Sequence, residues 1–269
     1  MSLPRPTRYC FILFASIAFV FVIQTCWFSS ANTIIGLLKD KGASISVSRN
    51  PDESIFYRWI YGMVGYPAIG IESIVLGNHL AFRTFIDSQC SEHLPNGCAV
   101  EISGVAINKQ DAASLVAEGN VSFLTFKNCS GSFLSPSFDG QGVHAISVID
   151  CSFEIPFIEL FESTHGIETL SIENCRFPTY PTKSRLNIGN LQLRRMSAMS
   201  AENVISASSH LSFLSLYRIS GDPKALYDAI PYGTLNDLVI VESSFSGQQI
   251  DSIRSRFPAL CLWVSADGD

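Results

Sequence analysis

Apolar residues recur along this chain at the first, third and sixth positions of a short motif. In the stretch ETLSIENCRF, residues 168–177, these positions are held by Leu170, Ile172 and Cys175. Nine copies of the motif begin, in order, at Ile74, Val100, Leu124, Ile146, Leu170, Leu191, Leu214, Leu238 and Leu260. Successive copies are between 21 residues (170 to 191) and 26 residues (74 to 100) apart. A repeat of this length is typical of a solenoid, in which each copy adds one coil to a stacked core.

The first and third positions of each copy predict a β-strand, because successive side chains of a strand point to opposite faces. Leu170 and Ile172 are expected in the core, whereas Ser171 and Glu173 are expected to face outward. Three return segments are predicted to be helical: residues 108–119, 223–230 and 248–256. Prolines favour an extended path through residues 177–183. The predicted fold class is an α/β solenoid of about nine parallel strands with helical or irregular return segments.

A right-handed parallel β-helix is the main alternative, because its coils have a similar length. Such a fold would place further strands where helices are predicted here, and it often carries carbohydrate-active enzymes. Those enzymes need carboxylates and basic residues clustered on one sheet. The outward strand positions of this chain instead hold scattered charges, namely Glu101, Lys127, Glu173, Arg194 and Asp237. These carboxylates form no matched pair, which disfavours the enzyme hypothesis.

Residues 10–28 form a run of nineteen residues without a charge. As a helix, a run of this length matches the hydrocarbon core of a membrane, which is about 30 Å thick. Two arginines precede it, and the positive-inside rule therefore places residues 1–9 in the cytoplasm and residues 29–269 outside it. Small residues just after the run leave a second interpretation open, a cleaved signal peptide. Either interpretation exports the same domain.

Residues 29–73 are expected to cover the open end of the first repeat strand, as the terminal segments of solenoids do. A short amphipathic helix is predicted at residues 30–42, where apolar residues have helical spacing and Gly42 marks the end. Alternation then predicts a strand at residues 43–48. The repeat domain itself is expected to span residues 74–269.

Several of these features follow one another in a characteristic order. After the uncharged run come a helix ending in Lys41 and Gly42, a strand, a segment containing Trp59, and LxLxxC-type strands that open with IESIVLGN at residues 71–78. This series resembles the membrane-anchored bacterial leucine-rich-repeat proteins over nearly the whole chain. The family consensus has Asn or Cys at the sixth position, which here holds Cys129, Cys151, Cys175, Met196, Ile219 and Ser243. The resemblance implies a non-catalytic binding or scaffolding module displayed outside the cytoplasm.

Charge and motif content argue against several function classes. The formal charge is -6, and no dense cluster of Lys and Arg follows the N-terminal run, so nucleic acid is not an expected partner. The five histidines fall at different repeat positions. The sequence contains no nucleotide-binding, metalloprotease or serine-hydrolase motif. We therefore expect no catalysis and no cofactor.

The cysteines fall into two groups. Cys129, Cys151 and Cys175 occupy the sixth position of consecutive copies, where a small side chain is expected to fill the core and its thiol to meet a loop carbonyl. They lack the paired CxxC spacing of zinc sites. Cys90 and Cys98 bracket a polar loop, and in an exported chain they are candidates for a disulfide. The sequence leaves open whether they are bridged.

One outward column supplies the candidate binding residues. The residue that follows the third position of each copy reads, in order, Gly77, Ser103, Lys127, Ile149, Glu173, Arg194, Tyr217, Val241 and Trp263. Its last three members are large and apolar, and exposed clusters of this kind are frequent at protein interfaces. The predicted contacts for a protein partner or a second copy are Phe213, Tyr217, Val241 and Trp263, together with the charged Lys127, Glu173 and Arg194. An unrecognised end cap over this patch is the alternative.

Overall fold

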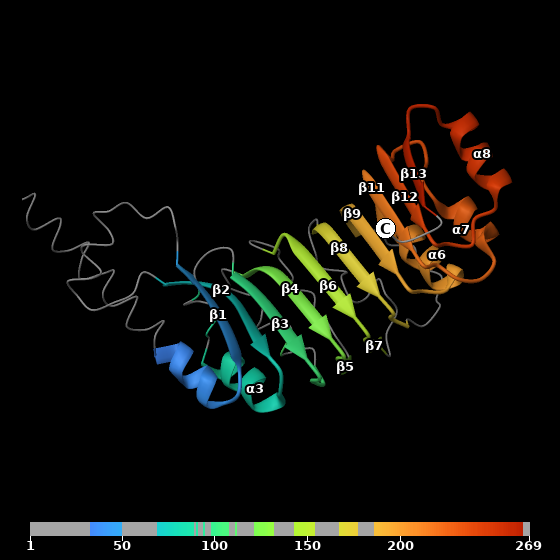
Figure 1. The fold of residues 1–269 in the computed structure, drawn as a ribbon. Coiled ribbons are helices and arrows are strands. Elements are labelled where there is room, and N and C mark those ends of the chain that lie inside the picture. The colour runs from blue at the N-terminus through green and yellow to red at the C-terminus, as the bar shows by residue number, and fades with distance from the viewer. Residues whose placement is uncertain are drawn as a thin grey trace, which may run out of the picture.

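The computed structural model describes residues 33–49, 69–88, 90, 94, 98–107, 111, 121–131, 143–153, 167–176 and 186–265. In this part of the chain, one long sheet stacks its strands side by side in chain order (Figure 1). Nine of them pair in parallel: β2 (Ile69–Leu76), β3 (Cys98–Ser103), β4 (Val121–Lys127), β6 (Ala145–Ile149), β8 (Ile167–Glu173), β9 (Leu186–Arg194), β11 (Phe213–Tyr217), β12 (Asp237–Val241) and β13 (Cys261–Ser265). The structure thus has the solenoid-like α/β architecture that the repeat predicts.

The predicted strand register is correct for the first eight copies. Their first apolar residues lie opposite one another along the sheet, and each is at most 2% exposed: Ile74, Val100, Leu124, Ile146, Leu170, Leu191, Leu214 and Leu238. The third positions are buried in the same way, as Ile172 and Leu216 show. The core is therefore a continuous row of apolar side chains behind the sheet.

The ninth copy begins two residues later than predicted. Leu238 pairs with Leu262 rather than with Leu260, and Val239 pairs with Trp263. Leu260 lies in the turn before β13, where its backbone N–H donates to the carbonyl of Phe257 at 3.0 Å. Because Leu260 and Leu262 are both apolar and two residues apart, they imitate the first and third positions of the motif. The column that contains Val241 therefore continues at Ser265, not at Trp263.

A left-handed residue ends the strand in seven consecutive copies. Their φ angles lie between 46° and 67°, at Gly104, Asn128, Asp150, Asn174, Arg195, Arg218 and Glu242. The backbone N–H of each donates to the last strand residue of the next copy, as Asn128 does to Ile149 at 2.9 Å. This bend turns the chain so that the following sixth residue points into the core. Gly, Asn and Asp adopt such angles readily, whereas Arg and Glu do so at a cost of about 1 kcal/mol.

The first described elements lie against β2. A helix at residues 33–40 places Leu38 in the core, and β1 (Ser44–Arg49) pairs with β2. The strand predicted at residues 43–48 is therefore present, and its pairing is antiparallel, in contrast to the rest of the sheet. Residues 10–28 lie outside the described residues, and so does the whole segment between β1 and β2, residues 50–68. Within the described ranges, no helix is long and apolar enough to cross a membrane.

Four labelled helices occupy the described return segments. α7 (Pro223–Ala229) and α8 (Gly247–Arg256) confirm two of the predicted helices. α3 (His79–Asp87) and α6 (Ala198–Ser206) were not predicted, although Asn78 and Ser197 cap them by accepting hydrogen bonds from the first turn. Of the predicted helix at residues 108–119, only residue 111 is described, and residues 177–183 lie outside the description.

A second, shorter parallel ladder follows the left-handed bend. It joins β5 (Ser130–Gly131) to β7 (Ser152–Phe153) and continues as single bridges in both directions. A further two-residue strand, β10 (Ser208–Ser209), pairs with the start of β9. Gly131 has a φ of 118°, and a Cβ on it would lie 2.4 Å from the carbonyl oxygen of Ile107. In the described return segments, the chain thus forms short ladders and helices rather than long strands.

Candidate functional site

The outer face of the sheet is polar over most of its length. In the column between the first and third positions, the residues from β2 to β13 are Val75, Glu101, Thr125, Ser147, Ser171, Gln192, Ser215, Val239 and Trp263. Serine, threonine and glutamine dominate the middle of this column, and apolar side chains appear only in its first strand and last two. The C-terminal end of the outer face therefore differs chemically from its centre.

Of the charged candidates, the structure brings Glu173 and Arg194 together and places Lys127 apart from them. Lys127 lies on β4, with Ile149 between it and Glu173 on β8. Glu173 lies opposite Arg194, and its Oε1 is 3.3 Å from the Nη1 of Arg195. Lys127 therefore stands apart, whereas the Glu173–Arg194 pair continues in register toward β11.

Tyr217 and Val241 do lie together, as predicted. Tyr217 pairs with Arg194 on one side and with Val241 on the other. The Arg218 guanidinium stacks over the Tyr217 ring at 5.0 Å. Phe213 is half-buried at the opposite end of β11, four residues and thus about 13 Å from Tyr217. Phe213 and Tyr217 therefore share one strand and both face outward, but they lie at its opposite ends.

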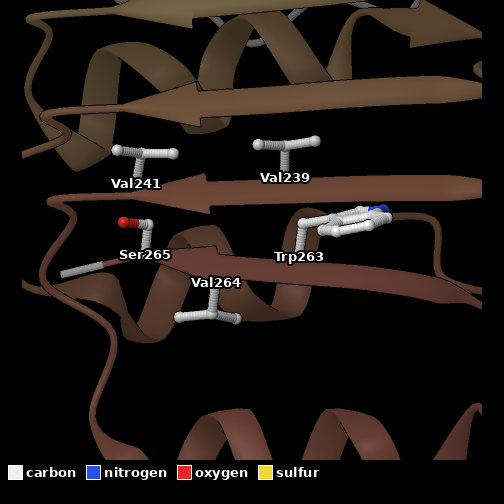
Figure 2. A pocket seen from close by; sticks show the side chains of 5 residues that line it. All are labelled: Val239, Val241, Trp263, Val264 and Ser265. Carbon is white, nitrogen blue, oxygen red and sulfur yellow. The ribbon is translucent and has the colours of Figure 1, made fainter. Parts of the chain in front are cut away.

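Four side chains form what we call the C-terminal outer patch: Tyr217, Val239, Val241 and Trp263. Trp263 is 65% exposed, and its indole lies beside Val239 on the neighbouring strand (Figure 2). Its Nε1–H donates to the Cys261 sulfur at 3.1 Å, which holds the ring flat along the strand. Valine, tyrosine and tryptophan side chains thus form one apolar surface on β11, β12 and β13. Sequence reasoning missed Val239, because the shifted register of the ninth copy paired Trp263 with the wrong column.

The inward side of β13 is also exposed. Figure 2 shows Val264 on the opposite side of β13 from Trp263 and Ser265. Val264 lies in register with Ile240, which is 2% exposed, yet Val264 itself is 43% exposed. Leu262 is only half-buried for the same reason: in the described chain no further coil stacks on β13. A shallow hollow lined by Val239, Val241, Trp263, Val264 and Ser265 joins the two sides.

The cysteine column has the structural role that its position predicts. Cys129, Cys151 and Cys175 are each at most 4% exposed. The Cys151 thiol donates to the Ile149 carbonyl at 3.2 Å and accepts from the backbone N–H of Cys129 at 3.3 Å. The side-chain hydrogen bond with Cys151, together with burial, raises the pKa of the Cys129 thiol. Within the described residues, no group of three potential ligands is placed to hold a metal ion.

Cys90 and Cys98 are two free thiols in the structure, so the suggested disulfide is not formed. Both are buried, and burial raises the pKa of each thiol to about 11. The Cys90 sulfur faces the Thr84 carbonyl of α3, whereas the Cys98 sulfur faces the carbonyl of the next residue on β3. The short spacing between the two cysteines suggested a disulfide, but each sulfur faces a different backbone carbonyl.

One buried ion pair was not anticipated from the sequence. Asp111 is 2% exposed, and its Oδ1 lies 2.5 Å from the Nη1 of Arg83 on α3. A carboxylate that is buried to this degree requires such a partner. The pair ties α3 to the return segment of the following coil.

Comparisons with known proteins give no match to any family model, to any curated protein or to any solved structure. The function proposed for this site is therefore based on the geometry of this chain alone.

Proposed function

We propose that this protein is a non-catalytic leucine-rich-repeat module that is anchored in the membrane through residues 10–28 and displays its repeat domain outside the cytoplasm. There it binds or scaffolds a protein partner, or a second copy of itself, through the C-terminal outer patch. No cofactor takes part. The family assignment is supported by the repeat of 21 to 26 residues, by the single long parallel sheet and by the hydrogen-bonded cysteine column.

The observation that carries the binding proposal is the position of Trp263. An indole that is 65% exposed lies beside the outward Val239 and lines a hollow with Val241, at one end of a face whose central column is serine, threonine and glutamine. Tryptophan and tyrosine are enriched among the residues that dominate binding energies, and apolar patches on soluble surfaces frequently mark interfaces. The solenoid presents this patch on a rigid sheet, so little conformational entropy is lost when a partner binds.

The charged residues of the outer face support a non-catalytic role. Glu173 is paired with Arg195, and its neighbours in the ladder are Ile149 and Arg194. A glycosidase site that uses paired carboxylates would require a second carboxylate near Glu173. Neither ladder neighbour of Glu173 is a carboxylate.

The proposal is tested by capture of partners with the full-length protein in non-ionic detergent. The double substitution of Val239 and Val241 to Ser makes the patch polar, like the middle of the sheet, where Ser147 and Ser171 occupy the position equivalent to Val239. We expect cross-linked partners to be lost by about tenfold or more. Ile149→Ser is the matched control, since it removes an outward apolar side chain of the same column far from the patch. Equal capture by both variants would eliminate the patch as the binding site.

The predicted orientation has its own measurement. Protease added outside spheroplasts should digest residues 29–269 and spare the cytoplasmic residues 1–9. Protection of the repeat domain in intact spheroplasts, with digestion only after lysis, would reverse the assignment.

A further inference from the structure

The last strand, β13, has an unpaired edge within the described chain. Its Cys261 N–H donates to Asn236 at 2.9 Å, and its Ser265 carbonyl accepts from Glu242 at 3.0 Å. Because successive backbone groups of a strand point to opposite sides, residues 261, 263 and 265 direct their N–H and C=O groups toward β12. Those of Leu262 and Val264 point away from the sheet. The edge therefore carries two donors and two acceptors that no strand of the described chain pairs.

Side chains at the same edge are uncovered. Val264 is 43% exposed, although its equivalents on β11 and β12 are at most 2% exposed. The edge therefore lacks both backbone partners and a layer of apolar side chains. An extended strand with inward apolar residues would supply both at once.

The residues of β13 are symmetric in character about Trp263. Small polar side chains, Cys261 and Ser265, stand at the ends, and aliphatic Leu262 and Val264 flank the indole. The strand has no charge, no proline and no bulge, which are the features that protect exposed edges from pairing with one another. A strand with this symmetry is complementary to itself when two copies run antiparallel.

We propose that two copies of this chain associate through antiparallel pairing of their β13 strands, with the twofold axis at Trp263. In this register, Leu262 of each copy lies opposite Val264 of the second copy. Since both residues direct their backbone groups to the edge, the two pairs form four hydrogen bonds and leave none of these groups unpaired. Leu262 and Val264 then cover their counterparts, and the two cores become continuous.

The same register places the two Trp263 residues in a directly opposed pair without hydrogen bonds. In such pairs the Cα atoms approach to about 4.5 Å and the side chains are in contact. Both indoles remain on the outer face, so pairing joins the two C-terminal outer patches into one surface. The inference goes beyond the proposed function, because it concerns the sheet edge and holds whether or not another protein binds the outer face.

The association is tested on the full-length protein by sedimentation in detergent. Val264→Pro removes only an edge-facing N–H, and proline is tolerated at such positions of edge strands. Val264→Thr keeps both the N–H and the branched shape. We expect the wild type and Val264→Thr both to be dimers, and Val264→Pro to dissociate at least about tenfold more readily than either, with an unchanged circular-dichroism spectrum. A monomeric wild type, or a Val264→Pro dimer of wild-type affinity, would overturn the proposal.

A cross-linking experiment tests the register itself. The twofold axis at Trp263 places Cys261 of one copy opposite residue 265 of the other, in a pair without hydrogen bonds and within disulfide reach. Ser265→Cys should therefore give covalent dimers under mild oxidation by a copper–phenanthroline catalyst with oxygen, whereas wild-type Cys261 residues lie too far apart to join. Equal cross-linking of both proteins would reject this register. The two proposals can be refuted independently. Val264→Pro changes the edge of β13 but keeps the outward Val239 and Val241, whereas the substitution of those two valines by Ser keeps the edge of β13 unchanged.

Discussion

Replacement of Cys151 by Ala and by Ser separates hydrogen bonding from packing in the core of this solenoid. The thiol is 2% exposed, accepts the Cys129 N–H at 3.3 Å and donates to the Ile149 carbonyl at 3.2 Å. Cys151→Ala leaves a buried N–H without its acceptor, at a cost of about 1–3 kcal/mol. The void left by the sulfur adds about 1 kcal/mol. The free energy of unfolding should therefore fall by about 2–4 kcal/mol.

Serine should be tolerated better, because the eighth copy of the motif already uses it. Ser243 occupies the equivalent position, accepts the Ile219 N–H at 3.1 Å and donates to the Val241 carbonyl at 2.9 Å. Cys151→Ser keeps both hydrogen bonds and should cost about half as much as the alanine variant or less. If the thiol only filled space, the order would reverse, since a buried hydroxyl without partners costs about 1–3 kcal/mol.

Equilibrium unfolding by denaturant measures the difference directly. The full-length protein is held in non-ionic micelles, and far-ultraviolet circular dichroism follows the sheet. Both variants should keep the wild-type denaturant slope, so that the midpoints report stability. A serine variant that is less stable than the alanine variant would refute the hydrogen-bonding role of the column.

Three further changes test other parts of the structure. Leu170→Ala should cost about 2–5 kcal/mol and Ser171→Ala less than about 0.5, because the first is fully buried and the second faces outward; equal losses in thermal unfolding would contradict the alternation. Gly131→Ala should destabilise by more than about 1 kcal/mol through its positive φ and its close approach to the preceding coil, and an unchanged melting temperature would argue against that bend. At pH 8, maleimide should modify exposed Cys261 rapidly. Cys98, whose pKa burial raises to about 11, should react orders of magnitude more slowly until the pH approaches that value; equal rates would show that it is not buried.

The inward strand positions could be predicted from the sequence because the period of two is imposed by the backbone itself. Once a strand was assigned there, Leu170 and Ile172 had to lie on the same face of the sheet, and both are fully buried. The register of the last strand failed for a local reason. Leu260 and Leu262 are spaced like the motif, and only the hydrogen bond of Leu260 to the turn after α8 excludes it from the ladder.

The left-handed bend was readable in part. Gly104, Asn128, Asp150 and Asn174 are residues that favour positive φ, and they stand at one repeat position. In the next three copies the same position holds Arg195, Arg218 and Glu242. These residue types disfavour a positive φ, so the bend cannot be recognised from the sequence there. Of the candidate site, Tyr217 and Val241 could be found together from the sequence, whereas Val239 and Val264 depended on the corrected register.

The uncovered side of β13 has a consequence for how the array loses structure. Each coil is held only by the coils before and after it, so stability along the array is the sum of nearest-neighbour terms. The coil that contains β13 has one such neighbour in the described chain, while the coil of β8 has two. Opening should therefore begin at β13 and progress inward coil by coil, with amide exchange slowest near β8. A second copy stacked on the edge would give β13 its missing neighbour and make the two arrays unfold as one cooperative unit.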